Sequence, residues 1–472
     1  MNERRLYLDG SWQPGEGWAE VRSPYDGRAI SRVAQAGAAQ VERALEVAVA
    51  GRTRLAALST GSRRSVLQRV VEGLHARAEE LAGLICDEAG KPLRMARAEV
   101  QRCIQTFGFA AAELASFGGR TLPVDFDAAS EGYECETRRF PAGVVVGLVP
   151  FNFPLNLGAH KVAPALAVGA PIIVKPPPQA PSAQLVLAEL VQAAGADPAA
   201  LQVLPCSNTE AERLATDARV RVLSFTGSAK VGWHLKARAA AKVALELGGN
   251  AAVLVCEDAD LDWAAQRCAL GGLSYAGQVC IKVQRIYVEA RAQAAFLERP
   301  QARVRAARMG DPRDESTVVG PVIDDASAQR IESWVREAQE AGATLLQGFS
   351  RDGRMVAPTL LTQVPAHLRV VREEVFGPVL VVEGVEDFET GLARMNEGEY
   401  GLQAGLFTQN LRKVRTAFHA LEVGGVVVND YPTFRSDNFP YGGVKRSGLG
   451  REGARSTMEE FTEERVLVTR SR

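Results

Sequence analysis

Short apolar runs alternate with helical patterns along the chain after Pro141. The runs are rich in valine, isoleucine and leucine, which indicates strands with both faces covered. Helical patterns separate them, as is typical of parallel strands joined by helical crossovers. The apolar runs are 143–149, 171–174, 201–204 and 220–225, and the helical patterns are 159–168, 183–194 and 211–216. The chain is therefore predicted to contain an α/β lobe with a parallel sheet, a common nucleotide-binding architecture.

The rest of the chain divides into three further patterns. Residues 39–103 have helical spacing, whereas residues 120–140 combine strand formers with charge and are interpreted as an excursion, such as a hairpin. A second α/β lobe is predicted from a further series of runs, which are 251–255, 284–288, 379–382, 402–407 and 426–428. At roughly 150 residues per unit, 472 residues fit about three lobes.

Composition and charge narrow the classes of partner. The formal net charge is -1, so no long-range field favours nucleic acid or an anionic membrane. The longest uncharged stretch, 141–159, holds three prolines and two asparagines, which are costly in lipid. No leader peptide is recognised, and the seven cysteines lack a Cys-x-x-Cys pair. We expect a cytoplasmic protein that binds neither nucleic acid nor membrane, and no metal-ligand spacing is seen among the five histidines.

Two segments could hold a phosphate or ribose. Gly227 and Ser228 lie between a predicted strand and a predicted helix, where unpaired N–H groups and the helix dipole favour an anion. Ser228 could equally be an ordinary N-cap. Lys175 ends a predicted parallel strand, the edge at which ligands gather, although a solvated lysine is common there.

Three residues have side chains suited to acyl chemistry. Asn152, fixed between prolines, could donate to an oxyanion or cap a turn. Glu246 ends an apolar strand, where burial would raise its pKa toward the range of a general base, unless it is a surface residue. Cys280 follows a glycine loop and could be a thiolate nucleophile, although an isolated buried cysteine is usually inert.

The segment around Glu374 and Phe376 offers a carboxylate for ribose hydroxyls and an aromatic ring for a flat ligand. The alternative is a plain turn before the strand at 379–382.

Taken in order, these segments resemble the aldehyde dehydrogenase superfamily. The matching motifs are Pro150-Phe151-Asn152-Phe153-Pro154, Phe225-Thr226-Gly227-Ser228, Glu246-Leu247-Gly248-Gly249, Gly277-Gln278-Val279-Cys280 and Glu374-Val375-Phe376-Gly377-Pro378. The resemblance implies a Rossmann-like NAD(P)-binding domain at 1–121 and 142–248, and a catalytic domain at 249–448. It also implies a β oligomerisation segment at 122–141 and 449–472, in a homodimer or homotetramer.

The resemblance also implies a role for each matching residue. Cys280 would attack the aldehyde, Asn152 would hold the oxyanion, and Glu246 would activate the water that hydrolyses the thioester. The cofactor would be NAD or NADP, bound by Pro150, Phe151, Lys175, Pro178, Gly227, Ser228, Leu247, Glu374 and Phe376. Members strict for NAD often carry a glutamate where this chain has Pro178, so NADP is plausible.

The substrate is expected to be a small aldehyde. The motifs are nearest to members that act on lactaldehyde, glyceraldehyde phosphate or phosphonoacetaldehyde. Members that accept phosphate or phosphonate often carry arginine where this chain has Val279, which favours a neutral or weakly polar aldehyde. Arg102, His160 and Arg435 remain candidates to anchor an anionic substrate, with surface or structural roles as the alternative.

Three competing functions differ in the residues that they require. A coenzyme A-acylating dehydrogenase would generally lack the glutamate at 246. A catalytically silent structural or binding protein would have no need for Asn152, Glu246 and Cys280 together. A thiol hydrolase would pair Cys280 with a histidine and would leave the cofactor motifs unexplained.

Overall fold

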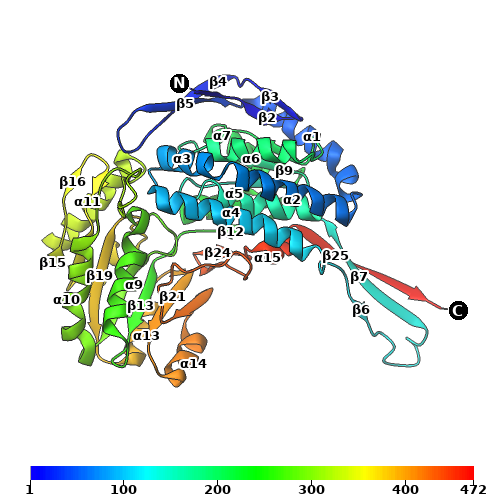
Figure 1. Cartoon of the computed structure of the whole chain (residues 1–472). Coiled ribbons are helices and arrows are strands. Elements are labelled where there is room, and N and C mark those ends of the chain that lie inside the picture. Colours follow the sequence, from blue (N-terminus) through cyan, green and yellow to red (C-terminus); the bar gives the residue numbers. More distant parts are fainter. Residues whose placement is uncertain (1, 472) are drawn as a thin grey trace.

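A computed structural model of the chain describes residues 2–471 and shows two α/β lobes and a projecting β arm (Figure 1). The first lobe contains an eight-stranded sheet in the order β24-β12-β11-β8-β9-β10-β2-β3. Its five central strands are parallel, as predicted: β8 (Val144–Leu148), β9 (Ile172–Lys175), β10 (Leu201–Val203), β11 (Val220–Thr226) and β12 (Lys242–Glu246). Antiparallel strands extend the sheet at its edges: β2 (Leu6–Leu8), β3 (Ser11–Gln13) and β24 (Gly448–Leu449).

Helices cover both faces of this sheet. The helices are α1 (Ala38–Ala56), α2 (Thr60–Ala76), α3 (Ala78–Ala89), α4 (Leu93–Glu113), α5 (Asn156–Val168), α6 (Ser182–Ala193), α7 (Asn208–Thr216), α8 (Ala229–Arg238) and α15 (Ala454–Glu460). Alternate residues of β8 join different cores: Val145 packs with α2–α6, and Val146 packs with α1 and α7. Burial on both sides explains why the strand is apolar at successive positions.

The second lobe contains a seven-stranded sheet in the order β15-β18-β19-β14-β13-β21-β22. The predicted runs correspond to β13 (Ala251–Val255), β14 (Val283–Glu289), β19 (Val379–Val385), β21 (Gln403–Phe407) and β22 (Gly425–Val428), with β15 (Thr344–Gln347) and β18 (Thr359–Thr362) added at one edge. Its helices are α9 (Leu261–Leu273), α10 (Ala290–Ala306), α11 (Asp325–Glu340), α12 (Arg369–Arg372), α13 (Phe388–Asn396) and α14 (Leu411–Ala420). This confirms the prediction of two α/β lobes.

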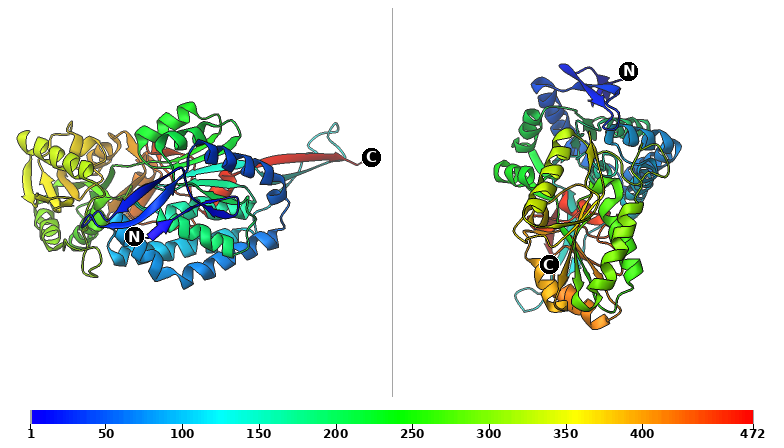
Figure 2. Two further views of the ribbon diagram at one scale, coloured as in Figure 1. Left: turned by 90° about the horizontal axis from the view of Figure 1, so that it is seen from above. Right: turned by 90° about the vertical axis from the view of Figure 1, so that its left-hand side faces the viewer.

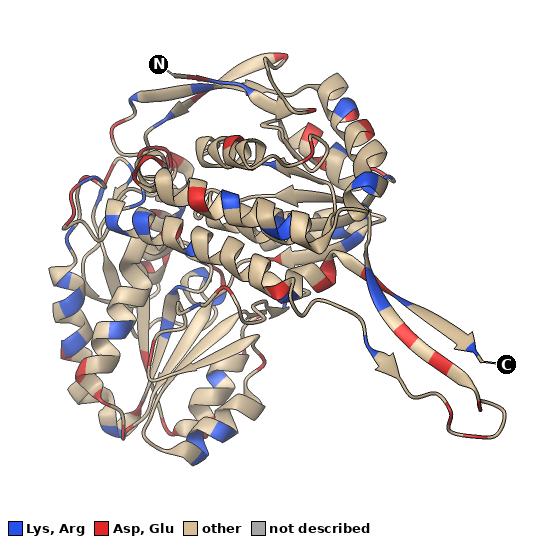
Figure 3. Ribbon diagram, turned by 45° about the vertical axis from the view of Figure 1, so that its right-hand side comes forward, with Lys and Arg blue, Asp and Glu red and all other residues tan. Residues whose placement is uncertain are grey.

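The β arm projects away from both lobes (Figures 1 and 3). It consists of β6 (Thr121–Leu122), β7 (Tyr133–Pro141) and β25 (Thr462–Arg470), with nine residues of β25 paired antiparallel to β7. The predicted segment 449–472 is only partly arm, because Met458 and Phe461 are buried in the core of the first lobe. Their apolar side chains fix α15 against α4 and α5. The part of this segment that belongs to the arm is β25, which starts at Thr462.

Residues 2–35 contain five strands that were not predicted from the sequence. A three-stranded sheet of β1 (Asn2–Arg4), β5 (Ala29–Gln35) and β4 (Gly17–Arg22) lies across the first lobe (Figure 2). Short elements complete the fold: β16 (Arg351–Asp352), β17 (Met355–Val356), β20 (Tyr400–Gly401), β23 (Val444–Lys445) and the 3-10 turn η1 (Ser274–Gly277). Within residues 2–471, no helix has the length and apolar character needed to cross a membrane.

The register of the first sheet brings functional segments to one edge. Leu148 of β8 pairs with Lys175 of β9 and with Phe225 of β11, and Thr226 pairs with Glu246 of β12. Because these strands are parallel, their carboxyl ends meet on the side that faces the second lobe.

Candidate active site

A cavity of about 990 Å³ lies between the two lobes. Most of the predicted site residues line it: Pro150, Phe151, Asn152, Gly227, Ser228, Glu246, Leu247, Cys280, Glu374, Phe376 and Arg435. The predicted residues that do not line it are Arg102, His160, Lys175, Pro178 and Val279. The structure therefore gathers all three proposed catalytic side chains at one place.

The loop that carries Cys280 has an unusual backbone. Tyr275, Ala276 and Gly277 have successive positive φ angles of 55°, 52° and 68°. A side chain at Gly277 would collide with the backbone of Gly377, so only glycine fits there. This turn ends the helical path of α9 and brings Cys280 to the cavity.

Cys280 is half-buried and its Sγ lies 3.2 Å from the hydroxyl oxygen of Tyr441. Burial raises the pKa of the Cys280 thiol to about 11, while the hydrogen bond with Tyr441 acts in the opposite direction. The resting thiol is therefore protonated near neutral pH, and a base or a change in the surroundings is needed to form the thiolate. Sequence reasoning did not assign a role to Tyr441.

Asn152 is buried, and its Nδ2 donates a hydrogen bond to the backbone carbonyl of Gln278 at 3.0 Å. An amide NH₂ carries two donors, so a second N–H remains for another acceptor. The bond ties the end of β8 to the loop that carries Cys280. The amide and the thiol are thus fixed relative to each other.

Glu246 ends β12 and is 7% exposed. Its Oε2 is buried without a hydrogen-bond partner. Burial, and then the negative charge of Glu452, raise the pKa of Glu246 well above its ordinary value. A carboxyl group with a raised pKa and an unpartnered oxygen in a cavity is suited to accept a proton from water.

A buried polar cluster beside Glu246 was missed by the sequence interpretation. Lys161 donates to the hydroxyl groups of Ser224 and Thr226 at 3.1 and 2.7 Å, and its Nζ lies 3.6 Å from Glu452. Although burial alone would raise the pKa of Glu452, nearby cations lower it to about 2. Lys161 is the only Lys, Arg, Asp or Glu in helix α5, and that was the one available signal.

The proposed substrate anchors are joined through one carboxylate. Asp437 is 1% exposed and accepts hydrogen bonds from Arg102, at 2.5 and 3.1 Å, and pairs with His160 at 2.9 Å. Arg435 pairs with Glu452 at 2.7 Å and stacks 3.9 Å from the centroid of the Tyr441 ring. Of the three candidates, only Arg435 lines the cavity; Arg102 and His160 lie behind it.

The remaining residues that were predicted to contact the cofactor or the substrate lie in different surroundings. Ser228 is the N-cap of α8 and accepts from Val231 N at 3.5 Å, so the alternative capping role is the one observed. Lys175 is 8% exposed, and burial lowers its pKa. Pro178 is exposed, whereas Val279 is buried in a small apolar cluster with Tyr275.

Glu374 and Phe376 line the cavity opposite the first lobe. Glu374 Oε1 accepts from the backbone N–H of Gly249 at 3.1 Å, and burial raises the pKa of Glu374 to about 7. The ring of Phe376 meets that of Phe151 edge to face at 5.9 Å between centroids. A carboxylate and two aromatic edges next to the amino end of α8 fit the ribose, flat ring and phosphate of a nicotinamide dinucleotide.

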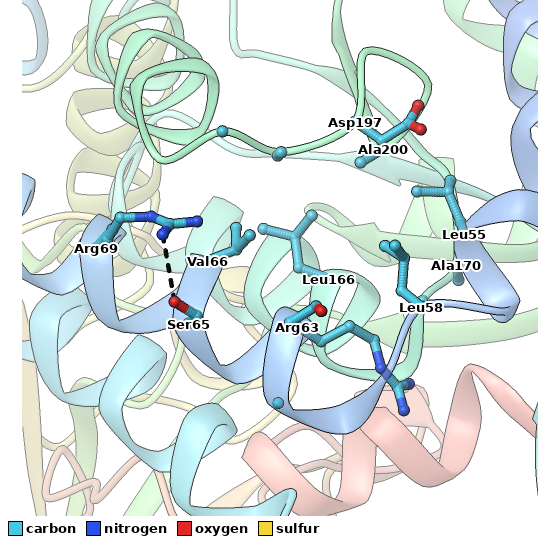
Figure 4. A pocket seen from close by; sticks show the side chains of 15 residues that line it. Leu55, Leu58, Arg63, Ser65, Val66, Arg69, Leu166, Ala170, Asp197 and Ala200 are labelled. Carbon is cyan, nitrogen blue, oxygen red and sulfur yellow. Dashed lines mark hydrogen bonds between the residues drawn. The ribbon is translucent and has the colours of Figure 1, made fainter.

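A second cavity of about 630 Å³ lies between α2, the end of α5 and residues 195–200, and contains none of the predicted site residues (Figure 4). Within residues 2–471, no group of three His, Cys, Asp or Glu side chains is placed to hold a metal ion.

Comparisons with known proteins identify the family. The aldehyde dehydrogenase family profile matches residues 12–467. A 3-sulfolactaldehyde dehydrogenase of Priestia aryabhattai is 39% identical over 98% of this chain and 97% of its own length. Aldehyde dehydrogenase 21 of Physcomitrella patens, solved with its reaction product succinate, is 40% identical with a TM-score of 0.97, covering 99% of this chain and 98% of that one.

An NADP-dependent glyceraldehyde-3-phosphate dehydrogenase of Bacillus halodurans, solved with NADP, is 31% identical with a TM-score of 0.97 and full coverage of both chains. The chain belongs to the aldehyde dehydrogenase family.

The contact between Tyr441 and Cys280 predicts a measurable effect on thiol reactivity. Replacing Tyr441 by phenylalanine removes the hydroxyl that stabilises the thiolate, so the pKa of Cys280 rises and alkylation by iodoacetamide at pH 8 slows by about tenfold. Tyr400→Phe, which lines the same cavity, is the matched control and should leave the rate unchanged. Equal rates in the Tyr441→Phe variant and the parent would contradict the assigned contact.

Proposed function

We propose that the protein oxidises a small aldehyde to the carboxylic acid, with NAD or NADP as the hydride acceptor. The observation that carries this proposal is the meeting of Cys280, Asn152 and Glu246 in one cavity between two α/β lobes. Membership of the aldehyde dehydrogenase family supports it.

In the first step, the Cys280 thiol loses its proton to solvent, and the resulting thiolate attacks the aldehyde carbonyl carbon and forms a carbon–sulfur bond as the carbonyl double bond opens. The carbonyl oxygen becomes an oxyanion, and the free N–H of Asn152 and the backbone N–H of Cys280 stabilise it. The fixed bond from Asn152 to Gln278 holds this donor at the thiol before the substrate arrives.

A bound nicotinamide would supply the acceptor for the hydride that leaves the tetrahedral carbon. Glu374, Phe376 and Phe151 would hold it, with its phosphates at the start of α8. The carbon is then a thioester of Cys280. Glu246 takes a proton from water, the hydroxide adds to the thioester, and Cys280 leaves as the acid is released.

Water is preferred over coenzyme A as the acceptor of the acyl group. Glu246 is buried beside the cavity with a raised pKa and an unpartnered oxygen, which a coenzyme A-acylating enzyme would not need. A silent structural protein would likewise have no use for this costly buried carboxyl group.

Arg435 favours an aldehyde that bears an acidic group, because its guanidinium lines the cavity. Beside it, a buried cluster holds two further cations, Arg102 and Lys161, together with the carboxylates of Asp437 and Glu452. Burial lowers the pKa of His160, so this side chain adds no charge to the cluster. The names of the sulfolactaldehyde and succinate-bound relatives agree with this preference, which differs from the neutral substrate favoured by sequence.

NADP is proposed as an accepted cofactor because Pro178, three residues after Lys175, supplies no carboxylate to repel a 2′-phosphate. Lys175 ends β9 at the same sheet edge as Glu246 and would contact the adenosine ribose.

A homo-oligomer, either a dimer or a tetramer, is proposed from the β arm. Val466, Leu467 and Val468 of β25 are successive residues, so they point to both faces of the arm, and each is more than half exposed. Exposed apolar side chains on both faces of a projecting sheet are typical of a protein interface, and a second copy of the chain would bury them.

A cytoplasmic location is proposed as well, because the seven free cysteines fit a reducing compartment.

Variants of the two central residues test the mechanism. Cys280→Ala should abolish aldehyde oxidation, while cofactor affinity measured by calorimetry stays within about twofold. Glu246→Gln should give a burst of reduced nicotinamide and then a steady state at least about 100-fold slower, because only thioester hydrolysis needs the base. Turnover of Cys280→Ala near the parental rate, or equal loss of both phases in Glu246→Gln, would overturn these roles.

A substrate panel tests the cofactor and the acidic group. Reduced-nicotinamide absorbance is followed with succinic semialdehyde and butanal, which differ mainly in the carboxylate, each with NAD and with NADP and with and without coenzyme A. We expect kcat/KM at least about tenfold higher for succinic semialdehyde, turnover with NADP, and no requirement for coenzyme A. A higher kcat/KM for butanal would instead support the neutral aldehyde that the sequence analysis favours.

Deletion of the arm strand tests assembly. A chain that ends at Phe461 lacks β25 but keeps the buried residues of α15, so the lobes should remain folded. Light scattering should show the full chain as a dimer or tetramer and the shortened chain as a smaller species. A full chain that is monomeric at micromolar concentration would refute the proposal.

A further inference from the structure

A fully buried lysine lies where the two lobes meet beside the loop of Cys280. Lys91 follows Gly90 in the turn between α3 and α4, and its Nζ is 2.5 Å from Glu99 Oε2. Both side chains have no exposed surface. A buried ion pair contributes little net stability compared with well-packed apolar side chains, so its presence here calls for another explanation.

The ammonium group of Lys91 contacts two aromatic rings from the two lobes. Its Nζ is 3.5 Å from the centroid of the Phe153 ring and 4.7 Å from that of Tyr275. Phe153 follows Asn152 directly, and Tyr275 opens the left-handed turn that leads to Cys280. The cation therefore attracts one ring from each segment that supplies the proposed oxyanion site.

Glu99 extends this contact to the residues that follow Phe153. Its Oε1 accepts from the backbone N–H groups of Leu155 and Asn156 at 2.9 and 3.1 Å, at the start of α5. The hydroxyl of Tyr275 donates to the carbonyl of Ala89 at 3.0 Å, which fixes the second ring against α3. The pair thus holds residues 153–156 and the Cys280 loop in one arrangement.

We propose that Lys91 and Glu99 are positioning residues for the oxidation, and that their charges hold the Asn152 amide and the Cys280 thiol in the relative geometry that the oxyanion requires. This inference rests on the roles proposed above for Asn152 and Cys280. Neither Lys91 nor Glu99 lines the cavity, so neither contacts the substrate.

The test is Lys91→Met, which keeps an unbranched apolar chain between the rings and removes the charge. Calorimetric titration with the cofactor that the parent uses counts folded binding sites, and kcat is expressed per binding site. We expect this kcat to fall about 100-fold, as for a misplaced catalytic group, with cofactor Kd and KM within about threefold. Glu99→Gln should show the same pattern, and it provides the test if Lys91→Met does not fold.

Lys413→Met is the matched control. Lys413 also pairs with a buried glutamate, Glu289, at 2.7 Å, and lies 5.3 Å from the Phe388 ring, within the second lobe and away from the cavity. Its kcat per binding site should match that of the parent.

The pH profile separates positioning from stability. The groups that face Lys91 are Glu99 and Arg102 from α4 and Tyr275 from the loop, and burial lowers the pKa of Lys91 to about 8. The parent's kcat per site should fall as the pH rises through about 8, because deprotonation removes the cation. Thiolate formation at Cys280 would instead increase the rate as the pH rises. The decrease in kcat above a pH of about 8 is therefore assigned to Lys91 and should be absent in Lys91→Met.

A Lys91→Met variant that binds fewer cofactor molecules but keeps the parental kcat per site would show a purely structural pair and overturn the inference. Activity in Cys280→Ala would instead overturn the proposed roles on which it rests.

Discussion

The register of five parallel strands is the constraint on which the rest of the site depends. Hydrogen bonding between β8, β11 and β12 places Asn152, Ser228 and Glu246 at or beyond strand ends on one edge of the first sheet. The second lobe then supplies the loop with Cys280, the segment with Glu374, and the side chains of Arg435 and Tyr441. The strained turn at Tyr275–Gly277 is the feature that lets the second lobe reach that edge.

Burial sets the chemistry of the resting site. The thiol of Cys280 is held with a raised pKa and is neutral before substrate binds, and the raised pKa of Glu246 makes its carboxylate a stronger base. Charge is concentrated instead in Arg435, Asp437 and Glu452, which form fixed ion pairs behind the reacting groups. A neutral thiol is a poor target for oxidants, which suits a nucleophile at an open cavity.

Local patterns in the sequence were sufficient for the strands and for residues carried by motifs. The apolar runs at 143–149 and 251–255 predicted buried strands because both faces pack against helices. Asn152 and Glu246 were found because each follows or ends such a strand, and Cys280 because it follows a helical pattern and a glycine loop. Tyr441 and Lys161 were not assigned roles, since the contact from Tyr441 to Cys280 spans 161 residues and that from Lys161 to Thr226 spans 65. Such pairings depend on how the lobes pack, and no local pattern reports that.

The arm also orders events during synthesis. Strand β7 emerges from the ribosome early, whereas its partner β25 follows much later: Thr137 on β7 donates to Glu464, 327 residues further along the chain. Until then one edge of β7 has no partner, so its backbone N–H and C=O groups stay open to pairing with other strands. The arm can therefore form only after the residues of both lobes have been synthesised, which makes it one of the last parts of the fold to be completed.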